Sequence, residues 1–144
     1  MSHSWERAKH LCRSAYSDLV SMESSDEREY LKNITKKKKG RWHIGLKYSS
    51  SKWCWLSSTS NCINKTFSSP GNWRWIRQEP NNIGRENCVE MFANGWYNNI
   101  RCSHSYRETG VFDGGYICER KAGKKQCSIY IYVSYYVCPS VVVI

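Results

Sequence analysis

The sequence contains no Cys-x-x-Cys pair, although it has eight cysteines among its 144 residues. This absence argues against a zinc ribbon and against a thioredoxin-type redox motif, because both need closely spaced cysteine pairs. Cysteines without those roles are expected to form disulfides in an oxidising compartment. The chain is therefore predicted to be extracellular, either secreted or the ectodomain of a membrane protein. Its length suits one domain that disulfides help to stabilise.

The N-terminus lacks a secretory signal peptide, because the segment from Met1 to Glu6 leads directly into folded-looking sequence. We therefore expect a fragment or a splice form, or export information that lies elsewhere. Two sequons begin at Asn33 and Asn64 and are candidate glycosylation sites, which agrees with an extracellular location.

Acidic residues are scarce: 12 Asp and Glu face 22 Lys and Arg, for a net charge of +10. Such a charge favours polyanions such as sulfated glycans, anionic membranes or nucleic acid. Much of it lies in the segment Lys36–Arg41, which reads as a solvated loop between a helix and a strand. An extracellular chain is not expected to bind nucleic acid, so sulfated-glycan binding through Lys36–Arg41 stays as one functional hypothesis.

The chain also lacks a recognisable catalytic constellation. No nucleophile, base and orienting group can be assembled from the spacing of its histidines, so it is predicted not to be an enzyme. Each histidine is instead expected to be exposed or at the edge of the core: His3, His10, His43 and His104.

Hydrophobic periodicity predicts two helices and several short strands. Residues 5–14 repeat apolar side chains at helical spacing, residues 18–22 alternate like a short strand, and Ser24 to Glu27 has the S-x-x-E pattern that starts a second helix. Further strands are expected at 42–46, 53–56, 88–92 and 116–119, with a hairpin turn at Asn94-Gly95. This pattern predicts an α+β domain.

A long polar loop, residues 57–87, interrupts these elements, and loops of this length are generally functional. Together with a segment before Cys102, it supplies carboxylate and amide oxygens, which are the ligands of Ca²⁺. Pro80 can orient its two neighbours, and a Cys88–Cys102 link could bring both segments onto one ion, where a vicinal diol of a sugar could also bind. The alternative is an ordinary surface loop. The candidate ligands of ion and sugar are Glu79, Asn81, Glu86, Asn98 and Asn99.

Eight ordered blocks resemble the C-type lectin-like domain over about residues 5–120. They are Ser4-Trp5-Glu6-Arg7-Ala8 before Cys12, Leu19-Val20-Ser21-Met22 with Glu27, Trp42-His43-Ile44-Gly45-Leu46, Trp53-Cys54-Trp55, Glu79-Pro80-Asn81, Cys88-Val89, Trp96-Tyr97-Asn98-Asn99 before Cys102, and Tyr116-Ile117-Cys118-Glu119. The resemblance implies two helices, short antiparallel sheets, a long calcium- and sugar-binding loop, and disulfides Cys12–Cys118 and Cys88–Cys102. Cys54 and Cys62 are expected to form an extra pair.

Within the resemblance, Glu79-Pro80-Asn81 matches the triplet associated with mannose, fucose, glucose and N-acetylglucosamine, and Glu86 matches the next calcium ligand. Asn99 departs from the pattern, because the family has an aspartate there and a neutral amide should weaken Ca²⁺ binding. A second, auxiliary calcium site is expected to be absent, since Asn82 and Asn87 stand where acids would be.

The resemblance supports calcium-dependent binding of mannose-type glycans or glycoproteins as the first hypothesis. Recognition of a protein ligand without calcium is the second. A single lectin site binds weakly, so useful avidity would need clustering on a stalk outside this chain. The full-length form could then be associated with a membrane.

The last segment, residues 121–144, begins with basic residues and continues without charge from residue 126. It is just short of the roughly 20 apolar residues that span a bilayer. The N-terminal strand of the family is missing here, so the tail could replace that strand. A sequence altered by splicing or a frame change, or a membrane anchor, are the alternatives. Cys127 and Cys138 could pair with each other or with another chain.

Overall fold

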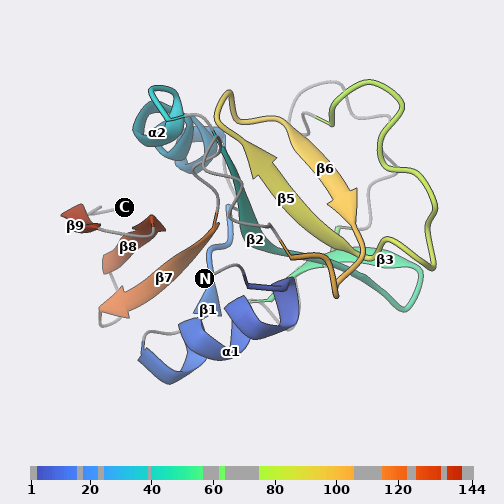
Figure 1. Cartoon of the computed structure of the whole chain (residues 1–144), viewed down its shortest axis with the longest axis horizontal. Coiled ribbons are helices and arrows are strands. Elements are labelled where there is room, and N and C mark those ends of the chain that lie inside the picture. The colour runs from blue at the N-terminus through green and yellow to red at the C-terminus, as the bar shows by residue number, and fades with distance from the viewer. Residues whose placement is uncertain are drawn as a thin grey trace.

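A computed structural model of the chain describes residues 3–15, 18–22, 25–38, 40–56, 62–63, 75–105, 115–122, 126–133 and 136–140. The sequon at Asn64 lies outside the described residues. The described part has the predicted α+β architecture, with two helices around a mixed sheet (Figure 1).

The two helices lie on opposite sides of the central strands (Figure 1). Helix α1 (Trp5–Ala15) buries Trp5, Ala8 and Cys12, and the Ser4 hydroxyl accepts a hydrogen bond from the Arg7 backbone N–H at 3.2 Å, as expected of an N-cap. Helix α2 (Ser25–Thr35) begins within the predicted S-x-x-E segment. Each helix therefore starts where its capping sequence predicts.

The sheet has the strand order β4-β3-β2-β7-β8-β9. Strand β1 pairs with β7, while β5 pairs with both β2 and β6. Their bounds are β1 (Asp18–Leu19), β2 (Arg41–Ser49), β3 (Lys52–Trp55), β4 (Cys62–Ile63), β5 (Cys88–Phe92), β6 (Tyr97–Ile100), β7 (Gly115–Ala122), β8 (Gln126–Val133) and β9 (Tyr136–Ser140).

Two hydrophobic clusters hold these layers together. The larger one joins α2 to β2, β3, β5 and β6, with Leu31, Trp42, Trp53, Met91 and Tyr97 among its members. The smaller one joins α1 to the sheet around Trp5, whose indole N–H donates to the Ile44 carbonyl at 2.8 Å. Trp42, Trp53 and Trp55 are buried core residues.

Disulfides link elements that are distant in the chain. Cys12–Cys118 joins α1 to β7, and Cys88–Cys102 joins the start of β5 to the segment after β6. Cys54 is also disulfide-bonded, and Cys62 lies opposite it in the register of β3 and β4. That register agrees with the expected Cys54–Cys62 pair.

The tail forms strands. Strand β8 pairs antiparallel with β7, and β9 pairs with β8. Because β1 and β2 pair with β7 along its other edge, β8 lies on the opposite edge of β7. The tail is therefore part of the sheet, and its role as a replacement for another strand stays a prediction. No helix among the described residues is long and apolar enough to cross a membrane.

Cys127 lies in β8 and Cys138 lies in β9. Their pairing with each other or with another chain stays a prediction.

Two further expectations need correction. The strand predicted at residues 18–22 has only two residues, because the Val20 N–H donates to Ile117 while its carbonyl accepts from Gly45, so the chain crosses between strands instead of following one. His43 was expected to be exposed or at the core edge, but it is fully buried.

Candidate functional site

The β5–β6 hairpin forms the rigid base of the site. Its turn is the predicted Asn94-Gly95 pair, where Gly95 has φ = 84° and a Cβ would lie 3.3 Å from the Lys32 side chain. The Phe92 N–H donates the closing hydrogen bond to the Trp96 carbonyl at 2.8 Å. The register then places Asn98 opposite Glu90, and Asn99 opposite Val89, so both asparagines are held by the ladder.

The loop before β5 brings Glu79 and Asn81 into direct contact. The Glu79–Pro80 peptide bond is cis. The Asn81 amide Nδ2 donates to Glu79 Oε1 at 2.6 Å, and the Asn81 backbone N–H donates to Glu79 Oε2 at 3.1 Å. The two outer residues of the triplet therefore form one polar unit.

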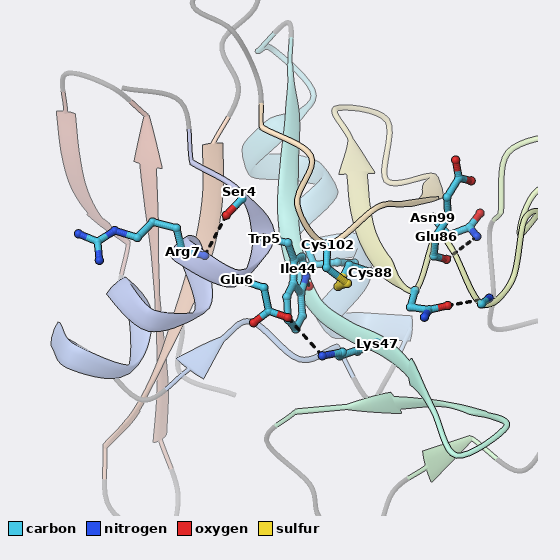
Figure 2. Close-up of a disulfide and its surroundings, with 12 residues drawn as sticks. Ser4, Trp5, Glu6, Arg7, Ile44, Lys47, Glu86, Cys88, Asn99 and Cys102 are labelled. Atoms are coloured by element: carbon cyan, nitrogen blue, oxygen red, sulfur yellow. Dashed lines mark hydrogen bonds and ion pairs between the residues drawn. A yellow bond between two sulfur atoms is a disulfide. The ribbon is translucent and has the colours of Figure 1, made fainter.

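Asn99 ties this unit to the next part of the loop, and Figure 2 shows its side chain beside Glu86. Its Oδ1 accepts from the Asn81 backbone N–H at 3.0 Å. Its Nδ2 donates to the Asn81 carbonyl and, at 2.8 Å, to the Glu86 carbonyl. With only 2% of its surface exposed, Asn99 joins both sides of the loop to β6.

All five predicted ligands line one cavity of about 420 Å³. Its wall also includes residues that sequence reasoning did not assign to the site: Arg41, Asn82, Glu90, Ile100, Arg101 and His104. Of these, Glu90 shares a face with Asn98 at its register position, so strand alternation could have found it. Arg41 and His104 are distant in sequence from the loop, and no local signal indicates them.

Glu90 and Arg41 support the cavity from beneath. Glu90 is fully buried, and its Oε1 accepts from the Asn98 amide at 2.8 Å and pairs with the Arg41 guanidinium at 3.3 Å. Arg41 also lies over the Phe92 ring, 4.6 Å from its centroid. Arg41 therefore belongs to the base of the site rather than to a freely solvated Lys36–Arg41 patch.

Three carboxylates and two guanidinium groups line the cavity. Partial burial, followed by the nearby carboxylates of Glu86 and Glu90, raises the pKa of Glu79, and the hydrogen bond from the Asn81 N–H opposes this. Clustered carboxylates repel one another, and a bound cation relieves that repulsion.

The donor set fits a hard cation in most respects. Glu79 and Glu86 supply carboxylates, and the Asn98 amide, which gives its N–H to Glu90, has its oxygen left as a ligand. Asn99 differs, because its amide oxygen and nitrogen both bond to the loop backbone. Its role is structural in this arrangement.

A second grouping of potential metal ligands among the described residues is Glu6 with Cys88 and Cys102. These cysteines form a disulfide, so neither offers a thiolate, and the Glu6 carboxylate pairs with Lys47 at 3.3 Å (Figure 2). We assign no metal to it.

The model of the Lectin C-type domain family matches residues 1–120. The chain belongs to this family. C-type lectin domains are carbohydrate-recognition modules without enzymatic activity, so the expected absence of catalysis agrees with the family.

Relatives of the domain include cell-surface lectins. L-selectin from Mus musculus is 34% identical over 89 residues, which are 61% of this chain and 22% of that protein. CD209 antigen-like protein A from Mus musculus is 29% identical over 101 residues, 70% of this chain and 40% of that protein. The chain therefore spans well under half of these relatives.

Solved structures share the fold. The mouse scavenger receptor C-type lectin carbohydrate-recognition domain has a TM-score of 0.58 and 25% identity, covering 73% of this chain and 78% of its own. The cow CD23 carbohydrate-recognition domain, determined in the presence of a GlcNAc2Man3 oligosaccharide, has a TM-score of 0.54 and 27% identity, covering 72% and 74%.

Proposed function

We propose that the chain is a calcium-dependent carbohydrate-binding module for sugars of the mannose, fucose and N-acetylglucosamine type. The observation that carries the proposal is the convergence of Glu79, Asn81, Glu86, Asn98 and Asn99 on one polar cavity. Glycans or glycoproteins would be its partners, outside the cell. Its disulfides support that location.

Calcium would be held by Glu79, Asn81, Glu86 and Asn98, and when bound it supplies a Lewis-acidic centre for two adjacent hydroxyl groups of a sugar. The chain's own groups orient the sugar: carboxylate oxygens of Glu79 and Glu86 accept from its hydroxyls, and the asparagine amides donate to them. The likeness to the CD23 domain, determined with a mannose-containing oligosaccharide, supports this sugar class.

A second candidate is calcium-independent recognition of a protein ligand. It is favoured by Asn99, whose amide joins the loop to β6 through hydrogen bonds that need no ion. Sulfated-glycan binding through Lys36–Arg41 is less favoured, because Arg41 is engaged with Glu90 and Phe92.

Retention on mannose-agarose tests the proposal. The refolded chain should be retained in millimolar Ca²⁺ and released by EDTA, because the sugar site depends on the ion. A chain that is folded by circular dichroism yet passes through the column would overturn the sugar proposal and favour the protein-ligand candidate.

A double variant tests whether the triplet sets specificity. Glu79→Gln with Asn81→Asp keeps the charge of the pair but exchanges its hydrogen-bond donors and acceptors. Retention should move from mannose-agarose to galactose-agarose. As a matched control, Glu29→Gln removes an exposed carboxylate on α2 and should leave mannose retention unchanged. Unaltered mannose preference in the double variant would place the site elsewhere.

A further inference from the structure

The end of α2 carries a sequon, Asn33-Ile34-Thr35. Asn33 is exposed, and its amide oxygen accepts a hydrogen bond from Lys36 Nζ at 3.2 Å on the protein surface. The amide nitrogen of Asn33 is the atom to which a glycan would be attached. A glycan at this position would therefore extend into solvent.

Thr35, the third residue of the sequon, is fully buried. Its hydroxyl lies 3.0 Å from the Leu31 carbonyl and 3.0 Å from the Ala93 carbonyl, so its proton is donated between them. Leu31 lies in the preceding turn of α2, whereas Ala93 lies in the β5–β6 turn beside that helix (Figure 1). The hydroxyl is therefore enclosed where the helix meets the hairpin.

Further contacts close the space around Thr35. Ile34, the middle residue of the sequon, packs against the larger hydrophobic cluster. In the β5–β6 turn, a Cβ added to Gly95 would lie 3.3 Å from the Lys32 Cβ. The helix and the turn are therefore in direct contact, and exposure of the Thr35 hydroxyl requires them to separate.

The helix also separates the two side chains that define the sequon. An asparagine is a glycosylation acceptor when Ser or Thr follows two residues later, so the enzyme must contact both side chains. On a helix, residues two positions apart do not face each other. In an extended chain they lie on the same face. The enzyme can therefore recognise this sequon in an extended chain but not in α2.

We propose that Asn33 is an N-glycosylation site that is modified before α2 packs on the β5–β6 turn and is closed to the enzyme afterwards. In the modification, Asn33 Nδ2 bonds to the anomeric carbon of an oligosaccharide carried on a lipid diphosphate. The bond from that carbon to the phosphate oxygen breaks, the lipid diphosphate leaves with the electron pair, and Nδ2 loses one proton. Sugar binding by the chain plays no part in this step.

Glycosylation of the full chain in vitro tests the proposal. The substitution Asn64→Gln removes the other sequon, so that a gain in mass reports Asn33 alone. The folded, disulfide-bonded chain and the reduced, alkylated chain are each incubated with a solubilised oligosaccharyltransferase and a lipid-diphosphate oligosaccharide. The unfolded chain should be modified at least about tenfold faster, because the folded chain must first open locally.

Two glycine variants test whether the packing of α2 limits modification of the folded chain. Gly95→Ala adds a Cβ against Lys32 at a residue with φ = 84°, so it should loosen the turn and raise the rate. Gly84→Ala is the matched control, because φ is 97° there and the added Cβ would meet no described atom within 4 Å. Its rate should stay that of the parent chain.

Equal rates for the folded and unfolded chains would overturn the proposal, because burial of Thr35 would then not limit the enzyme. Absence of modification in the unfolded chain, while a short sequon peptide is modified in the same mixture, would also overturn it. A rate for Gly84→Ala as high as that for Gly95→Ala would overturn the role of the contact between α2 and the turn, since general loosening would then explain both.

Discussion

Asn99 is the residue at which the site departs most from its family pattern. The carboxylate expected there would only accept hydrogen bonds, whereas the amide donates to the carbonyls of Asn81 and Glu86. The buried Asn99 NH₂ group attracts two carbonyl oxygens that would otherwise repel each other, as a bound cation would. The loop is therefore held by a side chain of β6.

This role predicts the effect of Asn99→Asp. The carboxylate would face two carbonyl oxygens at a buried position, so the free energy of unfolding in EDTA should fall by about 2–4 kcal/mol. Millimolar Ca²⁺ should restore much of it, since the ion would bind the folded state. Urea denaturation with and without Ca²⁺ measures both effects.

Asn94→Asp is the matched control for that experiment. Asn94 is exposed, and its Oδ1 accepts from the Trp96 N–H, which an aspartate can also do. Its stability should change little and should not depend on Ca²⁺. An Asn99→Asp variant as stable in EDTA as the parent chain would show that the amide donor is dispensable.

His43 predicts a loss of stability in mild acid. Burial lowers its pKa to about 4, opposed by a hydrogen bond to the His3 carbonyl, to which Nε2 lies at 2.9 Å. The unfolded chain takes up this proton near pH 6.5 and the folded chain only near 4. The contribution of neutral, buried His43 to the free energy of unfolding is therefore fully present above about pH 6.5. The free energy of unfolding falls by up to roughly 3 kcal/mol as the pH drops to about 4.

Urea denaturation across this pH range checks the prediction. His43→Gln, which has no titrating group but keeps an N–H donor, should flatten the dependence, whereas His10→Gln at an exposed position of α1 should not. An unchanged slope in His43→Gln would assign the acid sensitivity to other groups.

At the scale of elements, the two disulfides should differ in their contribution. Cys12–Cys118 spans 106 residues and Cys88–Cys102 spans 14. In the chain-entropy description, replacement of the longer link should cost about 4–5 kcal/mol and of the shorter one about 3 kcal/mol. Variants in which both cysteines of one link are replaced by alanine, compared by urea denaturation, measure which link contributes more to the free energy of unfolding. A larger loss on removal of the shorter link would contradict the prediction.

Local sequence signals predicted the helices, the hairpin turn and most strands, because each depends on residues near in the chain. Asn94-Gly95 supplies the positive φ that its turn needs. The hydrogen-bond partners of Asn99 were not predictable in this way. They lie 18 and 13 residues away, and only tertiary placement brings Asn81 and Glu86 to it.

In the site and the tail, too, local sequence signals identified some features, while contacts between distant residues were not predictable. The triplet around Pro80 identified Glu79 and Asn81 as ligand candidates, but Arg41 and Arg101 reach the site through folding and carry no local pattern. The tail shows β-branched composition but nothing that specifies β7 as its partner. Pairing between distant strands depends on which edge remains open.

At the scale of the whole molecule, β7 is the strand on which the two ends of the chain meet. It receives α1 through Cys12–Cys118, and it pairs with β1 and β2 along one edge and with β8 along the other. The tail therefore completes the sheet, because the register from Tyr116↔Tyr132 to Ala122↔Gln126 covers the open edge of β7.

Truncation after Ala122 should expose that edge. Seven residue pairs with β8 would be lost, so the backbone amides of β7 that face β8 should exchange faster with solvent. Because an unpaired strand edge is a template for another chain, self-association should also rise. Hydrogen exchange and sedimentation measure these effects.

Truncation after Val133 removes β9 but keeps β8, so β7 should stay protected. Equal protection of β7 in all three chains would mean that the tail does not pair with it in solution.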